Sequence, residues 1–305
     1  MLPTDSTPGT TAVFRSARRN PCDERAFMLA AVGIAANIAY DGHQFLLEVN
    51  EVDAPRAVVH LTQYEAERRP KPAAPPPLPS HPQAWVGCVV YVLTLVAIGL
   101  LISNGFWRLD AFDAGELDAA RVQNGQWWRA WTALTLHRDG THLTANLAAG
   151  VWFGYLAARQ VGSGISWLLI VTGAAAANLL EALLGPASHR SVGASTAAFT
   201  ALGLLSAHAW RLRARENPHW AFRWAPLVAG VVLLSWFGAG DSDDPSAGGT
   251  TDVVAHVLGF LMGVSLGVGI AQQRAQALAE RIPQWLTGMA AIASIAIAWT
   301  CALIS

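Results

Sequence analysis

Residues 84–103 read AWVGCVVYVLTLVAIGLLIS, a stretch without a single charged side chain. A helix that crosses the hydrocarbon core of a bilayer needs about 20 mainly apolar residues, and this stretch meets that requirement. Six further segments fit the same description: 141–158, 165–184, 193–210, 222–239, 251–271 and 284–304. The segments 141–158 and 193–210 are marginal on hydropathy alone, so we expect them to be buried among the others. The sequence therefore predicts an all-α polytopic membrane bundle.

Composition supports this prediction and excludes several other classes of protein. Hydrophobic residues make up 53% of the chain and charged residues only 13%, which is too little polar material to cover a water-soluble surface. The formal net charge of −1 argues against nucleic-acid binding. Cys22, Cys88 and Cys301 are far apart, so neither a disulfide nor a zinc site is predicted from them. No motif indicates an organic cofactor or a metal.

The chain divides into three predicted parts, namely a small α+β domain at 1–69, a proline-rich linker at 70–83 and a membrane domain at 84–305. In the first part, Asp23 is expected to cap a helix that runs through Ile34. Alternation over 37–49 around Asp41-Gly42 predicts a hairpin, and a second helix opens at Asp53 and ends near Arg69. The predicted order is helix, strand, strand, helix. No motif in this part indicates a chemical function.

Arginine placement predicts the orientation, because basic residues near span ends stay on the cytoplasmic side. These residues are Arg68, Arg69 and Lys71 before the first span, Arg211, Arg213, Arg215 and Arg223 between the fourth and fifth, and Arg274 and Arg281 between the sixth and seventh. The loop between the fifth and sixth spans instead carries Asp241, Asp243, Asp244 and Asp252 with no basic residue. The amino terminus is therefore expected in the cytoplasm and the carboxyl terminus outside, although Arg108, Arg121 and Arg129 in the first outer loop, 104–140, weaken the rule there. The Arg- and Ala-rich composition favours a bacterial inner membrane.

Polar residues within spans are costly, so each one is a functional candidate. Ser195 lies in Gly193-Ala194-Ser195-Thr196 near the outer end of the fourth span, and His256 lies near the outer end of the sixth. His142 and Asn146, four residues apart, share one face at the start of the second span. A serine needs a base to become a nucleophile, and its oxyanion needs donors. Close packing would explain Ser195 alone, and helix pairing would explain Asn146 alone, but their conjunction at one depth favours catalysis.

The region from about 124 to 267 resembles the rhomboid intramembrane proteases. The motifs that carry this resemblance are Trp127-Trp128-Arg129-Ala130-Trp131, then His137, His142 and Asn146, then Gly193-Ala194-Ser195, and finally Ala255-His256 with Gly259 and Gly263. The resemblance implies a serine–histidine dyad, with Ser195 as nucleophile, His256 as base, and His142 and Asn146 serving the oxyanion. It also implies that His137 lines the cavity or holds water and that Phe199 lies against the catalytic histidine. The implied substrates are transmembrane proteins whose helices unwind easily.

The glycines Gly259, Gly263 and Gly267 recur every fourth residue, so a neighbouring helix is expected to approach the histidine span closely. The short connection Gly162-Ser163-Gly164 also fits the family, and the acidic loop before the sixth span could act as a lid. One departure is Thr196, where the family usually has glycine.

Two alternatives to a protease remain. Thr196 favours a catalytically silent rhomboid-like protein that binds membrane clients and steers their folding or degradation. A small-molecule transporter would require an internal repeat, and none is seen. The sequence does not indicate the oligomeric state.

Overall fold

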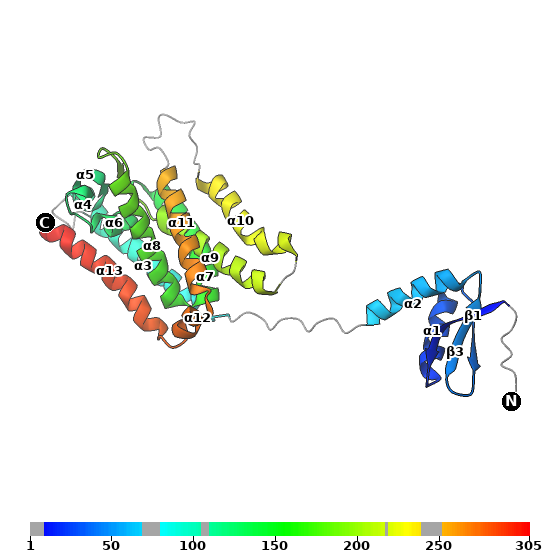
Figure 1. The fold of residues 1–305 in the computed structure, drawn as a ribbon. Helices are drawn as coiled ribbons and strands as arrows, with labels where there is room; N and C mark the ends of the chain where they lie inside the picture. The colour runs from blue at the N-terminus through cyan, green and yellow to red at the C-terminus, as the bar shows by residue number, and fades with distance from the viewer. Residues whose placement is uncertain (1–8, 69–79, 105–109, 217–218, 239–251) are drawn as a thin grey trace. The chain divides into compact units, whose positions relative to one another are not determined.

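The computed structural model describes residues 9–68, 80–104, 110–216, 219–238 and 252–305 (Figure 1). The chain forms two compact units, Met1–Pro76 and Pro77–Ser305. Several residues used above lie outside the described part, namely Arg69, Lys71, Arg108, Asp241, Asp243 and Asp244, together with most of the predicted linker. The proposed acidic lid, apart from Asp252, therefore also lies outside it.

The amino-terminal unit is a small α+β fold. Its elements are β1 (Thr10–Ser16), α1 (Asn20–Ala31), β2 (Ala36–Tyr40), β3 (Phe45–Asn50) and α2 (Ala54–Arg68). The strands form one antiparallel sheet in the order β1-β3-β2. Residues from both helices and from β3 pack into the core of this unit, which includes Leu29, Leu47 and Leu61.

The predicted hairpin is confirmed, because β2 and β3 pair around a turn in which Asp41 accepts hydrogen bonds from the backbone of His43 and Gln44. Strand β1 was not predicted. Its pairing with β3 is long-range, and a register shift between Ala12 and Phe14 interrupts the alternation that marks a strand.

The predicted limits of the first helix were wrong. Helix α1 begins at Asn20 with a proline in its first turn, so Asp23 lies within that turn rather than at the cap. It ends at Ala31, where Gly33 takes a positive φ of 77°.

The second unit is a bundle of long helices. They are α3 (Ala84–Ser103), α7 (Gly140–Val161), α8 (Ser163–Leu184), α9 (Ser195–Glu216), α10 (Trp220–Gly238), α11 (Val253–Ile270) and α13 (Gln284–Ile304), with the short α12 (Gln273–Ala279) before the last. Each of the seven predicted segments overlaps one of these long helices. Within the described residues, five of these helices, α3, α8, α10, α11 and α13, are long and apolar enough to span a membrane. The other two, α7 and α9, are the segments predicted to be marginal.

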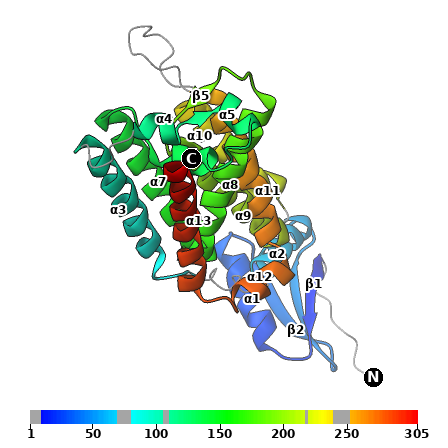
Figure 2. The ribbon, with the colours of Figure 1, turned by 90° about the vertical axis from the view of Figure 1, so that its left-hand side faces the viewer.

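A layer of short elements is formed by the part of the chain that follows α3 and precedes α7 in the sequence. They are α4 (Ala111–Gly115), β4 (Leu117–Asp118), α5 (Ala119–Gln123), α6 (Arg129–Thr132) and the 3-10 helix η1 (Ala133–Thr135). Figures 1 and 2 show α4 and α5 at the end of the bundle where α13 terminates. Strand β4 pairs with β5 (Arg190–Ser191), which lies just before α9. Arg190 reinforces this pairing through ion pairs with Glu116 and Asp118 at 2.8 and 3.0 Å.

Arg129 holds this layer together from inside. Its side chain is buried and donates to Gln126 Oε1 and to the backbone oxygens of Glu116 and Asp113 at 2.6, 2.9 and 2.8 Å. A charge that is buried this deeply needs such partners. Arg129 therefore has a structural role here.

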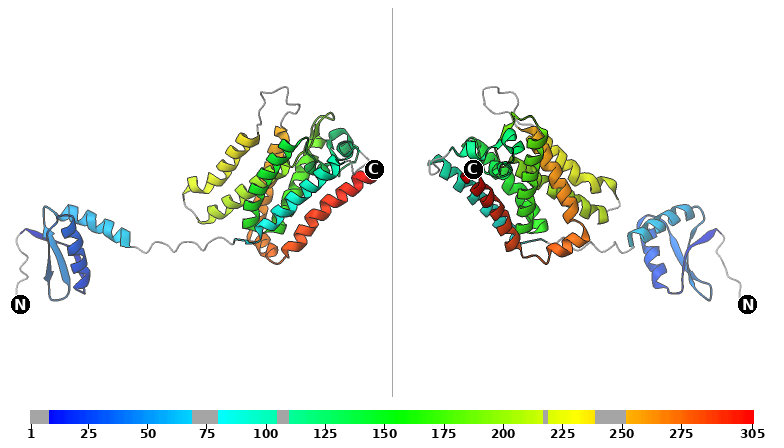
Figure 3. Two further views of the ribbon diagram at one scale, coloured as in Figure 1. Left: turned by 180° about the vertical axis from the view of Figure 1, so that it is seen from behind. Right: turned by 60° about the vertical axis from the view of Figure 1, so that its left-hand side comes forward.

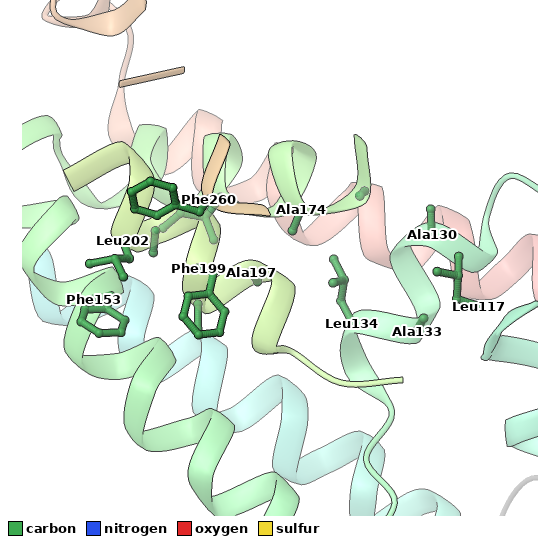
Figure 4. Close-up of a cluster of buried hydrophobic side chains, with 14 of the residues drawn as sticks. Leu117, Ala130, Ala133, Leu134, Phe153, Ala174, Ala197, Phe199, Leu202 and Phe260 are labelled. Atoms are coloured by element: carbon green, nitrogen blue, oxygen red, sulfur yellow. The ribbon is translucent and has the colours of Figure 1, made fainter. Parts of the chain in front are cut away.

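Helix α9 is packed by α7, α8, α10 and α11, whereas α10 and α13 lie on opposite sides of the bundle (Figures 1 and 3). Figure 4 shows Phe199, Leu202 and Phe260 in the buried apolar cluster of this unit. The predicted close approach of the histidine helix is confirmed. A Cβ placed on Gly263 would lie 2.1 Å from the backbone oxygen of Thr200, so α9 and α11 touch through their backbones.

The connection between α7 and α8 is shorter than predicted. Only Gly162 separates the two helices, with φ of 100°, and both Ser163 and Gly164 belong to α8. Gly164 is in close contact with the start of α13, since a Cβ there would overlap the backbone of Gln284. Gly164, which was predicted to lie in the connection, thus allows α8 and α13 to pack closely.

Helix α13 is tied to the short-element layer by Trp299. Its indole Nε1 donates to Thr135 Oγ1 at 3.0 Å, and both side chains are buried. We expect Trp299→Phe to lower the free energy of unfolding by about 1–3 kcal/mol, because a buried hydrogen bond is lost. Thermal denaturation in detergent would measure this, with Trp285→Phe on the exposed face of the same helix as control. Equal losses in the two variants would contradict the prediction.

Candidate active site

Ser195 is the first residue of α9, and the backbone before it is held tightly. Gly193 N–H donates to Ala133 O at 2.9 Å, and Ala194 N–H donates to His137 Nε2 at 3.3 Å. Ala198 N–H donates to Ala194 O, which makes Ser195 the start of the first turn. The first N–H groups of a helix have no acceptor within the helix. The N–H groups of Ser195 and Thr196 are therefore available to an anion beside the serine.

Gly193 is required by both conformation and space. Its φ of 135° is unfavourable for other residues, and a Cβ there would lie 2.8 Å from His142 Nε2 and 3.3 Å from Asn146 Nδ2. The chain just before Ser195 thus passes directly against the two polar side chains of α7.

His256 lies on α11, one turn before Gly259. Gly259 faces Thr196, Gly263 faces Thr200 and Gly267 faces Leu204, so α9 and α11 run parallel. This register brings His256 level with the start of α9. The imidazole is 5% exposed, and its ring lies 4.5 Å from the ring of Phe199, one turn after Ser195. Asp252 caps α11 by accepting the N–H of Ala255 at 3.1 Å.

A cavity of about 960 Å³ is lined by five of the six predicted site residues: Ser195, His256, His142, Asn146 and Phe199. His137 is not among its lining residues. Its ring instead packs edge-on to His142, with centroids 5.2 Å apart, and supports the backbone at Ala194. Burial, and secondarily His142, lower the pKa of His137 to about 4, so it is neutral at pH 7 and able to accept that bond.

Asn146 presents an unused donor to this cavity. The residue is 5% exposed, and Nδ2 has no hydrogen-bond partner among the residues that the structure describes. Its backbone oxygen accepts the hydroxyl of Tyr91 at 2.8 Å, which holds this turn of α7 in place. A buried donor without an acceptor is costly, and such groups occur where a ligand or reacting atom completes them.

The amino-terminal ends of three helices meet at the cavity, since it is lined near the starts of α7, α9 and α11. Each helix start carries partial positive charge. The arrangement therefore favours an anion that forms close to Ser195.

Comparison with known families agrees with this geometry. The family model of the rhomboid domain matches residues 124–273, which hold α6 to α11 and every residue of the site. The chain therefore contains a rhomboid domain over these residues. It is thus an integral, multi-pass membrane protein with a small amino-terminal α+β region. No curated protein matches the chain.

Thr196 occupies a tight position in this rhomboid domain. It is buried, and a Cβ on Gly259 would lie 3.1 Å from its Cγ2 and 2.7 Å from its backbone oxygen. The extra bulk of threonine is thus accommodated against a glycine of α11. Its side chain contacts the neighbouring helix at the level of the serine.

A further group of polar residues in the rhomboid domain was not predicted from the sequence. Glu181, His189 and Asp252 also line the cavity, and their ligand atoms lie within 4.8 Å of one another. Glu181 could have been found, because an acidic residue within a span is itself unusual. His189 could not, since only the pairing of β4 with β5 brings its loop over the cavity.

Proposed function

We propose that this protein is an intramembrane serine endopeptidase. The observation that carries the proposal is that Ser195, at a helix start, and His256, on the adjacent parallel helix, line one cavity beside the unpaired amide of Asn146. A nucleophile, a base and an oxyanion donor are the three groups that acyl transfer requires.

In this mechanism His256 removes the hydroxyl proton of Ser195 as Oγ attacks the carbonyl carbon of the substrate peptide. The carbonyl oxygen becomes an oxyanion, and Asn146 Nδ2, His142 and the first N–H groups of α9 donate to it. The imidazolium of His256 then protonates the leaving amine, and an acyl-enzyme remains on Ser195. Water, deprotonated by His256, hydrolyses this ester and releases Ser195. Phe199 holds the imidazole ring from one side, and His137 supports the oxyanion side through Ala194.

The substrates are transmembrane proteins cleaved in or near their membrane segments. A regular helix hides its carbonyl groups in hydrogen bonds, so a segment that unwinds easily is the better substrate. The lipid bilayer surrounds both partners. The division at 69 and 83 into an amino-terminal domain, a linker and a protease domain belongs to the same proposal.

The orientation follows from charge. Arg211, Arg213 and Arg223 lie at the end of α9 and the start of α10, opposite the helix starts that line the cavity. Basic residues remain in the cytoplasm. The cavity therefore opens on the outer side, most simply of a bacterial inner membrane, with the amino terminus inside and the carboxyl terminus outside.

Asn146→Ala is expected to lower kcat by about 10²–10³-fold, the usual loss for one oxyanion donor. Substrate binding should change much less, because the donor acts mainly on the charge of the transition state. Initial rates of cleavage in detergent as a function of substrate concentration would separate the two. A raised KM with unchanged kcat would contradict the proposed role.

The proposed function itself is tested by cleavage of a transmembrane substrate in proteoliposomes. Wild type should cleave it, and Ser195→Ala should not. Ser191→Ala is the matched control, because Ser191 lines the same cavity and should be dispensable. Lack of cleavage by wild type, together with capture of the uncut substrate, would instead support the silent client-binding protein that Thr196 favours.

A further inference from the structure

Glu181, His189 and Asp252 converge from three separate segments at one edge of the cavity. Glu181 lies in the last turn of α8, His189 in the loop before β5, and Asp252 at the cap of α11. His189 Nε2 lies 3.1 Å from Asp252 Oδ2 and 3.6 Å from Glu181 Oε1. The three side chains therefore direct one nitrogen and two carboxylate oxygens at a common point.

The carboxyl groups of Glu181 and Asp252 are in contact, and two carboxylates in contact repel each other unless a proton or a cation lies between them. Glu181 is 4% exposed, and its Oε2 has no hydrogen-bond partner among the described residues. The same holds there for His189 Nε2 and Asp252 Oδ2, whose approach is close but lacks hydrogen-bond geometry. A deeply buried carboxylate oxygen without a hydrogen-bond partner, beside a second carboxylate and an imidazole nitrogen, fits a ligand that all three side chains can share.

The spacing fits a metal ion of a particular kind. Ligands that bind zinc tetrahedrally at about 2.0–2.1 Å are separated by about 3.3 Å, and the two distances here lie on either side of that value. The imidazole nitrogen disfavours calcium and magnesium, which prefer oxygen ligands. Three protein ligands would leave one position open toward the cavity, as in zinc sites that also bind water.

The site is held in place before any ion arrives. His189 N–H donates to Pro186 O at 2.9 Å, and His189 O accepts the N–H of Ala119 at 3.0 Å. Asp252 uses its other oxygen to cap α11, so only Oδ2 points to the group. Asp252 and His189 are 20% and 23% exposed, which leaves a path from the cavity.

We propose that Glu181, His189 and Asp252 bind a divalent cation of the zinc class at the edge of the cavity and that the bound ion inhibits the enzyme. Binding follows from the three side chains alone, whereas inhibition rests on the proposed protease function. Asp252 is one helical turn before His256, and all three ligands line the cavity that holds Ser195 and His256. A bound dication therefore occupies space that the substrate must enter.

Zinc binding is measured directly by equilibrium dialysis of tag-free, full-length protein in detergent, followed by elemental analysis. We expect wild type to bind one zinc ion per chain. Glu181→Gln and His189→Gln should bind it about 100-fold more weakly. Mutation of residues that only hydrogen-bond to a metal ligand lowers metal affinity by about 10–100-fold, and loss of a ligand itself should lower it at least as much. Matched controls are Glu280→Gln and His43→Gln, which are exposed and are not among the residues that line the cavity. Asp252→Asn retains a capping side chain and should weaken binding without unfolding α11.

No zinc on wild type would overturn the proposal, and so would equal zinc on wild type and both cavity variants. The former result would mean that a shared proton, not a metal, joins the two carboxylates. Size-exclusion profiles identify any variant that fails to fold. If every variant fails to fold, the zinc stoichiometry of the wild-type protein still tests the metal site.

Labelling of Ser195 by a fluorophosphonate separates this proposal from the protease itself. Zinc should slow labelling of wild type at least tenfold and leave Glu181→Gln unaffected. Zinc binding without any labelling would refute the protease and leave the metal site standing. Labelling that zinc does not slow would refute the inhibition.

Discussion

His256→Ala is expected to lower kcat for a transmembrane substrate by about 10⁴-fold, the upper range for loss of a general base. The serine hydroxyl is almost entirely protonated at neutral pH and attacks slowly without a neighbouring acceptor. His256 is buried on the helix parallel to that of Ser195, and its ring lies against Phe199. A water molecule in the space left by the ring cannot take over this role efficiently, because water is a much weaker base than imidazole.

The matched control for this prediction is His208→Gln. His208 is another buried imidazole of the bundle, but it lies on α9 within 2.9 Å of Gln160 and is not among the residues that line the cavity. Its replacement should reduce stability while retaining the cleavage rate. Rates within tenfold of wild type for His256→Ala would exclude His256 as the base, whatever the behaviour of the control.

Gly263→Ala is expected to separate α9 from α11 and lower the cleavage rate by about 100-fold, because misplacement of reacting groups by about 1 Å costs that much. The added Cβ would lie 2.1 Å from Thr200 O and 2.8 Å from Leu204 N, which are backbone atoms that cannot move aside. Overpacking of this kind also destabilises by about 1–3 kcal/mol. Both the melting temperature and the rate should therefore fall.

Gly269→Ala provides the comparison on the same helix, since a Cβ there would meet nothing within 4 Å. It should leave the melting temperature and the rate unchanged. A Gly263→Ala protein as active and as stable as Gly269→Ala would show that the contact between the two backbones is unimportant for the site.

The long helices were predictable from the sequence because their signal is local. The stretch 84–103 matches α3 at both ends, since apolar length alone defines it. The pairing of α9 with α11 was also predictable, because Gly259, Gly263 and Gly267 leave one face without bulk. Ser195, His256, His142 and Asn146 could be brought to one level by counting residues from the span ends.

Features that depend on distant contacts could not be predicted. Strand β1 requires β3 as its partner, and no local pattern in Thr10–Ser16 indicates this pairing. The position of His189 over the cavity depends on β4 pairing with β5. The hydrogen bond that His137 accepts from Ala194 depends on how the chain runs after η1. From its place in the sequence motif, His137 was expected to line the cavity instead.

In the proposed mechanism a base on α11 activates the hydroxyl at the start of α9. The decisive experiment is reaction of the folded, full-length protein with a fluorophosphonate, followed by mass spectrometry of the modified peptide. We expect the label on Ser195 in wild type and no label in His256→Ala. An unlabelled wild type, or equal labelling of Ser195 in both proteins, would rule out this mechanism.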